Sequence, residues 1–114
     1  MKYMIVTEGE VTNLKISEGA VKLSEVSYDK YLRNEAVAYK LIACVETYVN
    51  DVLKIQGYIS LNKVRDELGA KAIPYGYASG WLGTTSISFE VYSVRNADTG
   101  SLVDIIVDAK QKED

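Results

Sequence analysis

Few side chains in this sequence could do chemistry, because it contains no histidine and a single cysteine, Cys44. A Ser-His-Asp triad, a Cys-His pair and a histidine-ligated metal site all need an imidazole. The sequence therefore excludes all three. Without a histidine to activate it, Cys44 is interpreted as a small buried hydrophobe on the core side of a helix rather than as a nucleophile.

Carboxylates are the remaining route to acid–base chemistry. Asp104 and Asp108 lie four residues apart on one predicted strand, about 13 Å from each other, which is too far for a pair of glycosidase carboxylates. Both are expected to face solvent. Together with Glu8 and Glu10 they lack the spacing of a metal site. We therefore expect no catalytic residue, no metal and no cofactor, and a protein that is not an enzyme.

The candidates for binding are aromatic. The chain has nine tyrosines and one phenylalanine, and tyrosine suits half-buried surfaces because its apolar ring has a polar tip. Tyr75, Tyr77 and Trp81 lie in a stretch rich in glycine, which predicts a structured loop that could stack on a base or anchor a protein. If the loop is extended, Tyr75 and Tyr77 point to the same side and are exposed. Trp81 is interpreted first as a core residue between helix and sheet.

Two polar residues, Arg95 and Asn96, complete the list of candidate binding residues. Arginine binds phosphate and carboxylate groups bidentately, although a solvated strand end is the favoured interpretation here. The glycines at positions 76, 80 and 83 match neither a dinucleotide-binding fingerprint nor a P-loop. They are expected to serve turn geometry.

The hydrophobic pattern predicts one α+β domain over residues 1–114. In it, an antiparallel sheet made of N-terminal strands and a C-terminal β-hairpin packs against one long helix plus a short second helix. The predicted segments are a β segment (1–26), the long helix (27–57), a short strand and helix (58–69), an aromatic and glycine-rich loop (70–83), the hairpin (84–109) and a frayed charged tail (110–114).

Within the β segment, residues 11–16 and 21–26 are expected to form a hairpin, with Ile16 facing Val21 and Leu14 facing Leu23. The long helix is expected to start at a cap provided by Ser27 or Asp29 and to end at a left-handed Gly57. One helix stripe is expected to pack on one face of the C-terminal hairpin. The stripe is Leu41, Ile42, Val45, Val49 and Val52, and the hairpin residues are Ile87, Phe89, Val91, Val103, Ile105 and Val107.

The C-terminal hairpin is predicted to close through Asp98, Thr99 and a left-handed Gly100. This loop places Val91 opposite Val107, Ser93 opposite Ile105 and Arg95 opposite Val103. Because the turn chemistry and the hydrophobic alternation agree, they predict the same register independently.

Charge and hydropathy limit the partners. Thirteen basic and sixteen acidic residues give a net charge of -3, which excludes a strongly basic nucleic-acid binder and a polybasic membrane-docking protein. We expect no sequence-specific nucleic-acid binding. The N-terminus lacks the apolar stretch of a signal peptide and no segment has the length of a membrane span, so a cytoplasmic protein is expected.

Residues 57–69 (GYISLNKVRDELG), followed by residues 75–81 (YGYASGW), resemble a pattern in small accessory domains encoded by phages and prophages. The pattern is a helix, a step of glycine, a hydrophobic residue and serine or threonine, a short helix ending in Leu-Gly, a Gly-Trp and a β-hairpin. Here it spans about Tyr39 to Asp108. The resemblance implies a mobile-element protein, expected in the cytoplasm of the host cell. It also implies an inhibitor of bacterial defence or a protein that sequesters immune nucleotides.

Three hypotheses for function follow. The first is a non-enzymatic inhibitor that binds a host defence protein through the tyrosine-rich loop and a sheet edge. The second is a sponge for an immune nucleotide signal, with Tyr75, Tyr77, Trp81 and Arg95 supplying stacking and phosphate contact. The third is a minor virion or assembly component. A homo-oligomer is also expected, since pairing covers exposed hairpin edges.

Overall fold

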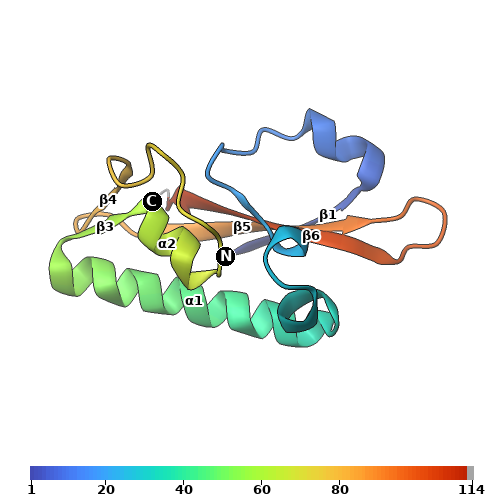
Figure 1. The fold of residues 1–114 in the computed structure, drawn as a ribbon, viewed down its shortest axis with the longest axis horizontal. Coiled ribbons are helices and arrows are strands. Elements are labelled where there is room, and N and C mark those ends of the chain that lie inside the picture. The colour runs from blue at the N-terminus through green and yellow to red at the C-terminus, as the bar shows by residue number, and fades with distance from the viewer. Residues whose placement is uncertain (113–114) are drawn as a thin grey trace.

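The fold is built on a four-stranded sheet with the strand order β1-β5-β6-β2 (Figure 1). The computed structural model describes residues 1–112. The strands β5 (Ile87–Arg95) and β6 (Leu102–Gln111) form an antiparallel hairpin, β1 (Lys2–Thr7) runs parallel to β5, and β2 (Val21–Lys22) runs antiparallel to β6. The predicted α+β class is confirmed, and the sheet is mostly antiparallel as expected, except that β1 joins it in parallel pairing. The sheet is mixed because the connection from β1 to β5 includes a long helix, which is the kind of crossover that parallel neighbours need.

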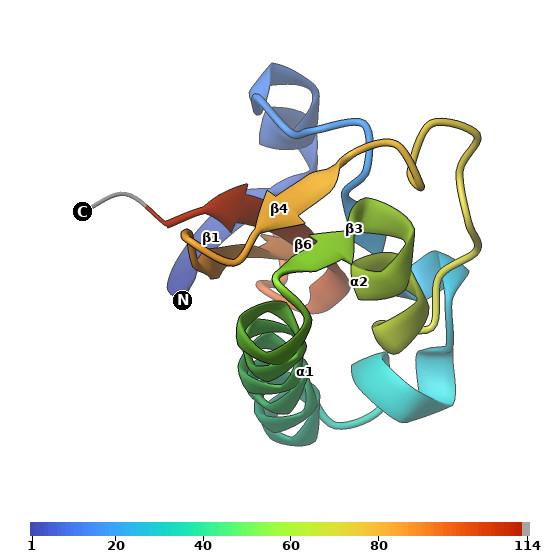
Figure 2. The ribbon, with the colours of Figure 1, turned by 90° about the vertical axis from the view of Figure 1, so that its left-hand side faces the viewer.

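Both faces of this sheet are covered. The helix α1 (Glu35–Gln56) packs on one face, and the 3-10 helix η1 (Glu8–Asn13) lies on the other (Figure 2). A second, smaller core forms beneath η1 from Val6, Tyr92, Val94 and Ile106. Residues 91–94 are therefore buried in succession, whereas the alternating pattern predicts apolar packing on one face only.

The hairpin predicted for residues 11–16 and 21–26 is wrong. Val11, Leu14 and Ile16 pack against the second core instead. Val21 pairs with Val107 of β6, and Leu23 begins the short 3-10 helix η2 (Leu23–Glu25) inside the main core. The hydrophobic alternation that predicts a hairpin thus has two separate causes. Residues 11–16 cover one face of the sheet, and residues 21–22 join it as β2.

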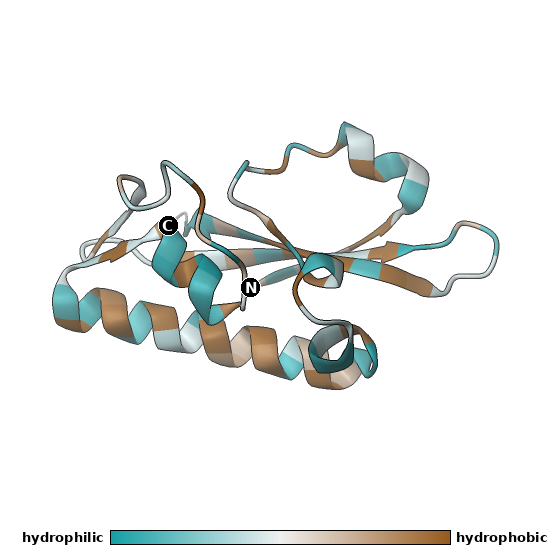
Figure 3. Cartoon of the chain, viewed as in Figure 1, coloured by the Kyte–Doolittle hydropathy of each residue, from teal (hydrophilic) through white to brown (hydrophobic). Residues whose placement is uncertain are grey.

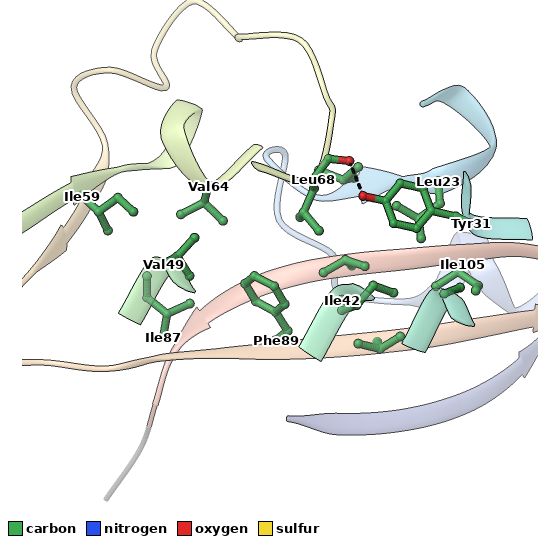
Figure 4. Close-up of a cluster of buried hydrophobic side chains, with 14 of the residues drawn as sticks. Leu23, Tyr31, Ile42, Val49, Ile59, Val64, Leu68, Ile87, Phe89 and Ile105 are labelled. Atoms are coloured by element: carbon green, nitrogen blue, oxygen red, sulfur yellow. Dashed lines mark hydrogen bonds between the residues drawn. The ribbon is translucent and has the colours of Figure 1, made fainter. Parts of the chain in front are cut away.

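The long predicted helix is interrupted before α1. The π-helix η3 (Tyr28–Leu32) is capped by Ser27, and α1 has its own cap because Asn34 Oδ1 accepts a hydrogen bond from the Val37 N–H at 3.3 Å. The interruption allows Tyr31 to be fully buried, with its hydroxyl donating to the Leu68 carbonyl at 3.0 Å (Figure 4). The predicted C-terminal residue Gly57 is confirmed, with a φ of 77°.

The core face of α1 is rotated from the predicted stripe. Ile42 and Val49 are fully buried as expected, but Leu41, Val45 and Val52 are only partly buried. The fully buried positions of α1 are Ala38, Ile42, Val49 and Leu53. In Figure 3, brown apolar segments alternate with teal polar ones along α1, as in an amphipathic helix.

Two residues predicted to be buried are exposed. Cys44 lies on the solvent side of α1 because of this rotation. Val103 is 41% exposed near the start of β6, beside the hairpin turn. The bulge after Val94 leaves Val103 without a partner in the register with β5.

A second sheet joins β3 (Tyr58–Ser60) to β4 (Gly80–Leu82) in antiparallel pairing. The helix α2 (Leu61–Glu67) follows β3 directly and is capped by Ser60, whose side chain accepts from the Lys63 N–H. The strand β4 lies inside the stretch expected to be a loop. A strand of three residues that begins with glycine is too short to show the alternation of apolar and polar residues that predicts a strand.

The C-terminal hairpin has the predicted register at Val91–Val107 and Ser93–Ile105, and Gly100 is left-handed with a φ of 72°. A bulge after Val94 places Arg95 opposite Leu102 rather than Val103. The predicted tail is partly wrong, because β6 extends to Gln111. Residues 113–114 of that tail lie outside the described residues.

Candidate binding surface

Exposed apolar side chains gather on the small β3–β4 sheet. Tyr58 and Leu82 are cross-strand partners and are 40% and 62% exposed. The Tyr58 hydroxyl reaches the backbone carbonyl of Tyr77 at 3.4 Å, and Tyr77 is 71% exposed. We call Tyr58, Tyr77 and Leu82 the aromatic surface. Ile55, 84% exposed in the last turn of α1, lies at the same end of the molecule.

Asn62 fixes the loop that carries Tyr77. This side chain is only 3% exposed, and its Nδ2 donates to the Ile73 carbonyl at 3.0 Å while its Oδ1 accepts from the Ile73 N–H at 2.9 Å. Its own backbone N–H donates to the Gly76 carbonyl at 3.0 Å. A Cβ at Gly76 would lie 2.0 Å from Asn62 Oδ1, so this packing requires a glycine.

Gly80 brings β4 close to β3. A Cβ at this position would lie 2.1 Å from the Ile59 carbonyl oxygen and 2.8 Å from the Tyr58 hydroxyl. Tyr58 therefore reaches over a residue without a side chain, as aromatic rings do beside strand glycines. Gly83 also holds β4 close to the chain that precedes β3, since its N–H donates to the Gly57 carbonyl at 2.8 Å. We call these close glycine contacts the clamp.

These glycines have a different role from the predicted one. Among the described residues, positive φ angles occur at Gly57, Gly69 and Gly100. Gly76, Gly80 and Gly83 instead allow close approach of backbone and side-chain groups. The aromatic surface is consequently held on a clamped scaffold.

Tyr75 and Tyr77 are both exposed, as predicted, but the loop between them is turned rather than extended. The Tyr75 carbonyl accepts from the N–H groups of Ala78 and Ser79, at 3.1 and 3.2 Å. The Tyr75 hydroxyl lies beside Glu18, and its pKa is raised by desolvation and by a hydrogen bond to that carboxylate. Tyr77 instead borders a hollow beside α2. The two rings therefore serve different parts of the surface.

Trp81 is half-buried and packs against the main core, in line with the favoured interpretation. It also lines a small hollow of about 210 Å³ with Leu61, Gly80 and Asp108. Its role in the site is to support β4, while its cross-strand partner Ile59 is buried beneath the sheet.

The two aspartates of β6 were expected to face solvent, and that expectation is wrong for Asp108, which is 1% exposed. Its Oδ2 accepts from the Ser17 N–H at 3.0 Å and forms an ion pair with Lys110 Nζ at 3.2 Å. Asp104 accepts from the N–H and hydroxyl of Ser24, at 3.0 and 2.7 Å. The aspartates therefore anchor the N-terminal segment to β6.

The turn between β5 and β6, which follows Arg95 and includes Asn96, lies at the opposite end of the long axis from the segment between α2 and β4 (Figure 1). The Arg95 guanidinium pairs with Glu35 in the first turn of α1. Asn96 Oδ1 accepts from the N–H groups of Asp98 and Thr99 and shapes the hairpin loop. The five predicted binding residues therefore do not form one site.

The surface offers rings and hydroxyls rather than a set of catalytic groups. Within residues 1–112, no group of three acidic or cysteine side chains is placed to hold a metal ion. No helix in the same range is long and apolar enough to cross a membrane.

Two of the three members of the aromatic surface, Tyr58 and Leu82, are not among the residues predicted from the sequence. Tyr58 could have been found, because a tyrosine one residue before a buried isoleucine in a strand must face outward. Leu82 could not, since nothing in its local pattern identifies β4 as a strand.

The fold and surface define a three-layer α+β domain with an exposed aromatic surface on a glycine-clamped two-stranded sheet. Residues 4–112 match a family described as a family of unknown function (DUF6353), and the chain belongs to that family. No curated protein and no solved structure matches the chain.

Proposed function

We propose that this protein is a non-enzymatic phage or prophage accessory protein that inhibits a bacterial defence system by binding a host protein. The aromatic surface is the observation that carries the proposal. Tyrosine and large apolar side chains dominate the energetics of protein interfaces. Because the glycine contacts hold this surface in place before binding, little conformational entropy is lost on association.

The remaining parts of the proposal rest on the sequence. The absence of histidine supports a binding role rather than an enzymatic one. The likeness of residues 57–81 to phage and prophage accessory domains supports a mobile-element origin and action in the host cytoplasm. Self-association of the chain is also part of the proposal, and it is supported by the structure, because β1 is the first strand in the sheet order and pairs with β5 alone.

The geometry favours a protein partner over a nucleotide signal. A nucleotide sponge would need Arg95 beside the aromatic loop to bind phosphate. Arg95 instead lies at the far end of the sheet, paired with Glu35. The nucleotide hypothesis therefore loses the cation on which it depended.

The test uses bacteria that carry one defined defence system and a phage which that system blocks. Expression of the wild-type chain should restore plaque formation for at least one system in a panel. Tyr77→Ala should abolish the rescue, whereas Tyr28→Ala, which removes a tyrosine that is 64% exposed elsewhere, should retain it. With the purified target, Tyr77→Ala should weaken binding by about 2 kcal/mol or more, the size of an interface hot spot.

Both variants should melt like the wild type, because each removes an exposed ring. If the wild-type chain rescues phage growth against none of the systems in the panel, defence inhibition is rejected. Equal rescue by Tyr77→Ala would instead reject the aromatic surface as the binding site.

A further inference from the structure

The strand β1 has a free outer edge. It pairs with β5 on one side only, and it is the first strand in the sheet order (Figures 1 and 2). It is six residues long, and two of its apolar side chains face solvent, with Tyr3 55% and Ile5 77% exposed. An exposed apolar edge of this kind is a template for pairing with another strand.

The other strand edges among the described residues are protected. Where β5 extends past the start of β1, Asn50 bonds to the N–H and carbonyl of Ile87 and Glu46 accepts from the Phe89 N–H. On the opposite edge of the sheet, Asp104 and Asp108 bind the chain that covers β6. The strands β2, β3 and β4 are only two or three residues long, which itself limits edge pairing.

The backbone groups available on β1 can be identified. The Thr7 N–H donates to Glu10 Oε1 at 3.0 Å and so does not bond to β5. Alternate residues of a strand direct their N–H and C=O groups to the same side. Tyr3 and Ile5 therefore present their backbone groups to the open edge, whereas Met4 and Val6 direct theirs to β5.

We propose that β1 pairs antiparallel with β1 of a second copy of this chain, around a twofold axis at Met4. Tyr3 then lies opposite Ile5 of the partner subunit, and the two four-stranded sheets become one sheet of eight strands. The free N–H and C=O groups of Tyr3 and Ile5 satisfy one another in two hydrogen-bonded pairs. The inference stands whether or not the aromatic surface binds a host protein.

Several features favour a second copy as the occupant. The free groups are self-complementary, as an isologous interface requires. Each Tyr3–Ile5 pair joins an aromatic to a β-branched side chain, which is a favourable cross-strand combination. Lys2 lies opposite Val6, so the register opposes no like charges.

The helix side of the sheet also suits the pairing. The Tyr3 ring meets the Tyr39 ring of α1 edge-on, with centroids 5.5 Å apart and planes at 83°. In the dimer, α1 of each copy lies over its own β5, and the two β5 strands are separated by three strand spacings of about 4.8 Å each. The two α1 helices therefore lie about 14 Å apart. That distance exceeds the 8–10 Å or so of directly packed helices, and the side chains of Tyr3, Ile5 and Tyr39 from both copies fill the difference.

The first test is the mass of the protein in solution by sedimentation equilibrium. The wild type should have twice the 12.6 kDa mass of the chain. Ile5→Lys should be monomeric or weaken the dimer by about tenfold or more, because an edge lysine blocks strand pairing. The matched control Ile55→Lys changes an 84% exposed isoleucine on α1 and should remain dimeric.

Circular dichroism melting should show that both lysine variants are folded, since each substitutes an exposed side chain. A wild-type monomer would overturn the proposal. So would a folded Ile5→Lys variant that dimerises like the wild type.

The second test fixes the register in a Cys44→Ser background. Met4→Cys should form an intermolecular disulfide on mild oxidation, because the twofold axis brings the two Met4 positions within disulfide range. Ile5→Cys should not, since the two Ile5 positions are diagonal neighbours about 7–8 Å apart. Efficient cross-linking through Ile5→Cys and not Met4→Cys would overturn the proposed register.

Discussion

The side-chain amide of Asn50 pairs with the backbone of Ile87 as a neighbouring strand would. Asn50 Oδ1 accepts from the Ile87 N–H at 2.8 Å, and Asn50 Nδ2 donates to the Ile87 carbonyl at 2.9 Å. These groups lie where β5 begins, before it pairs with β1 at Glu90. Asn50 of α1 thus satisfies the backbone groups at the edge of β5 where β1 does not pair with it.

Asn50→Ala should lower the free energy of unfolding by about 2 kcal/mol, because it leaves a backbone donor and acceptor without their partners. The measurement is urea denaturation followed by circular dichroism. Asp51→Ala is the control, since Asp51 is exposed on the next position of α1. Equal stability of Asn50→Ala and Asp51→Ala would show that water replaces the amide without loss.

Asp108 gives a prediction about the N-terminal segment. Its buried carboxylate accepts from the Ser17 N–H and pairs with Lys110. Asp108→Ala should lower the free energy of unfolding by about 1.5–3 kcal/mol, the range for hydrogen bonds to charged groups. Hydrogen exchange should accelerate at Ser17 and its neighbours before the rest of the sheet opens. Asp98→Ala in the exposed hairpin loop is the control, and unchanged exchange at Ser17 in Asp108→Ala would contradict the anchoring role.

Gly80 tests the clamp beneath the aromatic surface. Gly80→Ala places a Cβ 2.1 Å from the Ile59 carbonyl oxygen, so β3 and β4 must move apart. We expect a loss of about 2 kcal/mol or more in the free energy of unfolding, as for an overpacked site. Gly9→Ala is the matched control, because no atom lies within 4 Å of its added Cβ. Similar melting of the two variants would mean that the β3–β4 sheet is not a tightly packed element.

The parts of the fold that the sequence predicts are those with local signals. The Gly57 cap and the pairing of Val91 with Val107 each depend on turn chemistry or periodicity within a short window. The interrupted helix illustrates the limit. Nothing in the helical pattern reveals that Tyr31 bonds to the Leu68 carbonyl, 37 residues away.

The candidate site was predictable to a similar extent. The exposure of Tyr75 and Tyr77 follows from a loop rich in glycine and proline. The separation of Arg95 from these tyrosines depends on the length of β5 and on the direction in which α1 crosses it, which are tertiary properties. The burial of Asp108 likewise requires a partner, Ser17, that lies 91 positions earlier in the chain.

Tyr39 predicts a dependence of stability on alkaline pH. Its hydroxyl donates to Glu35 Oε1 at 2.7 Å and contacts Ser93. Desolvation raises the pKa of Tyr39, and the Glu35 carboxylate raises it further, although the Ser93 hydrogen bond opposes the shift. The unfolded chain loses this proton near pH 10, whereas the folded protein keeps it to higher pH. The contribution of the protonated Tyr39 hydroxyl to the free energy of unfolding is therefore fully present below about pH 10 and is lost as pH rises through the folded pKa.

Tyr39→Phe removes this titrating group. Its free energy of unfolding should be lower than that of the wild type at neutral pH, where the hydrogen bonds are lost, and the difference should shrink as pH rises above about 10. Urea denaturation at a series of pH values measures both quantities. Tyr28→Phe is the control, since the exposed Tyr28 ring lies outside this network. If the difference between Tyr39→Phe and the wild type stays constant with pH, the Tyr39 hydroxyl does not couple folding to proton release.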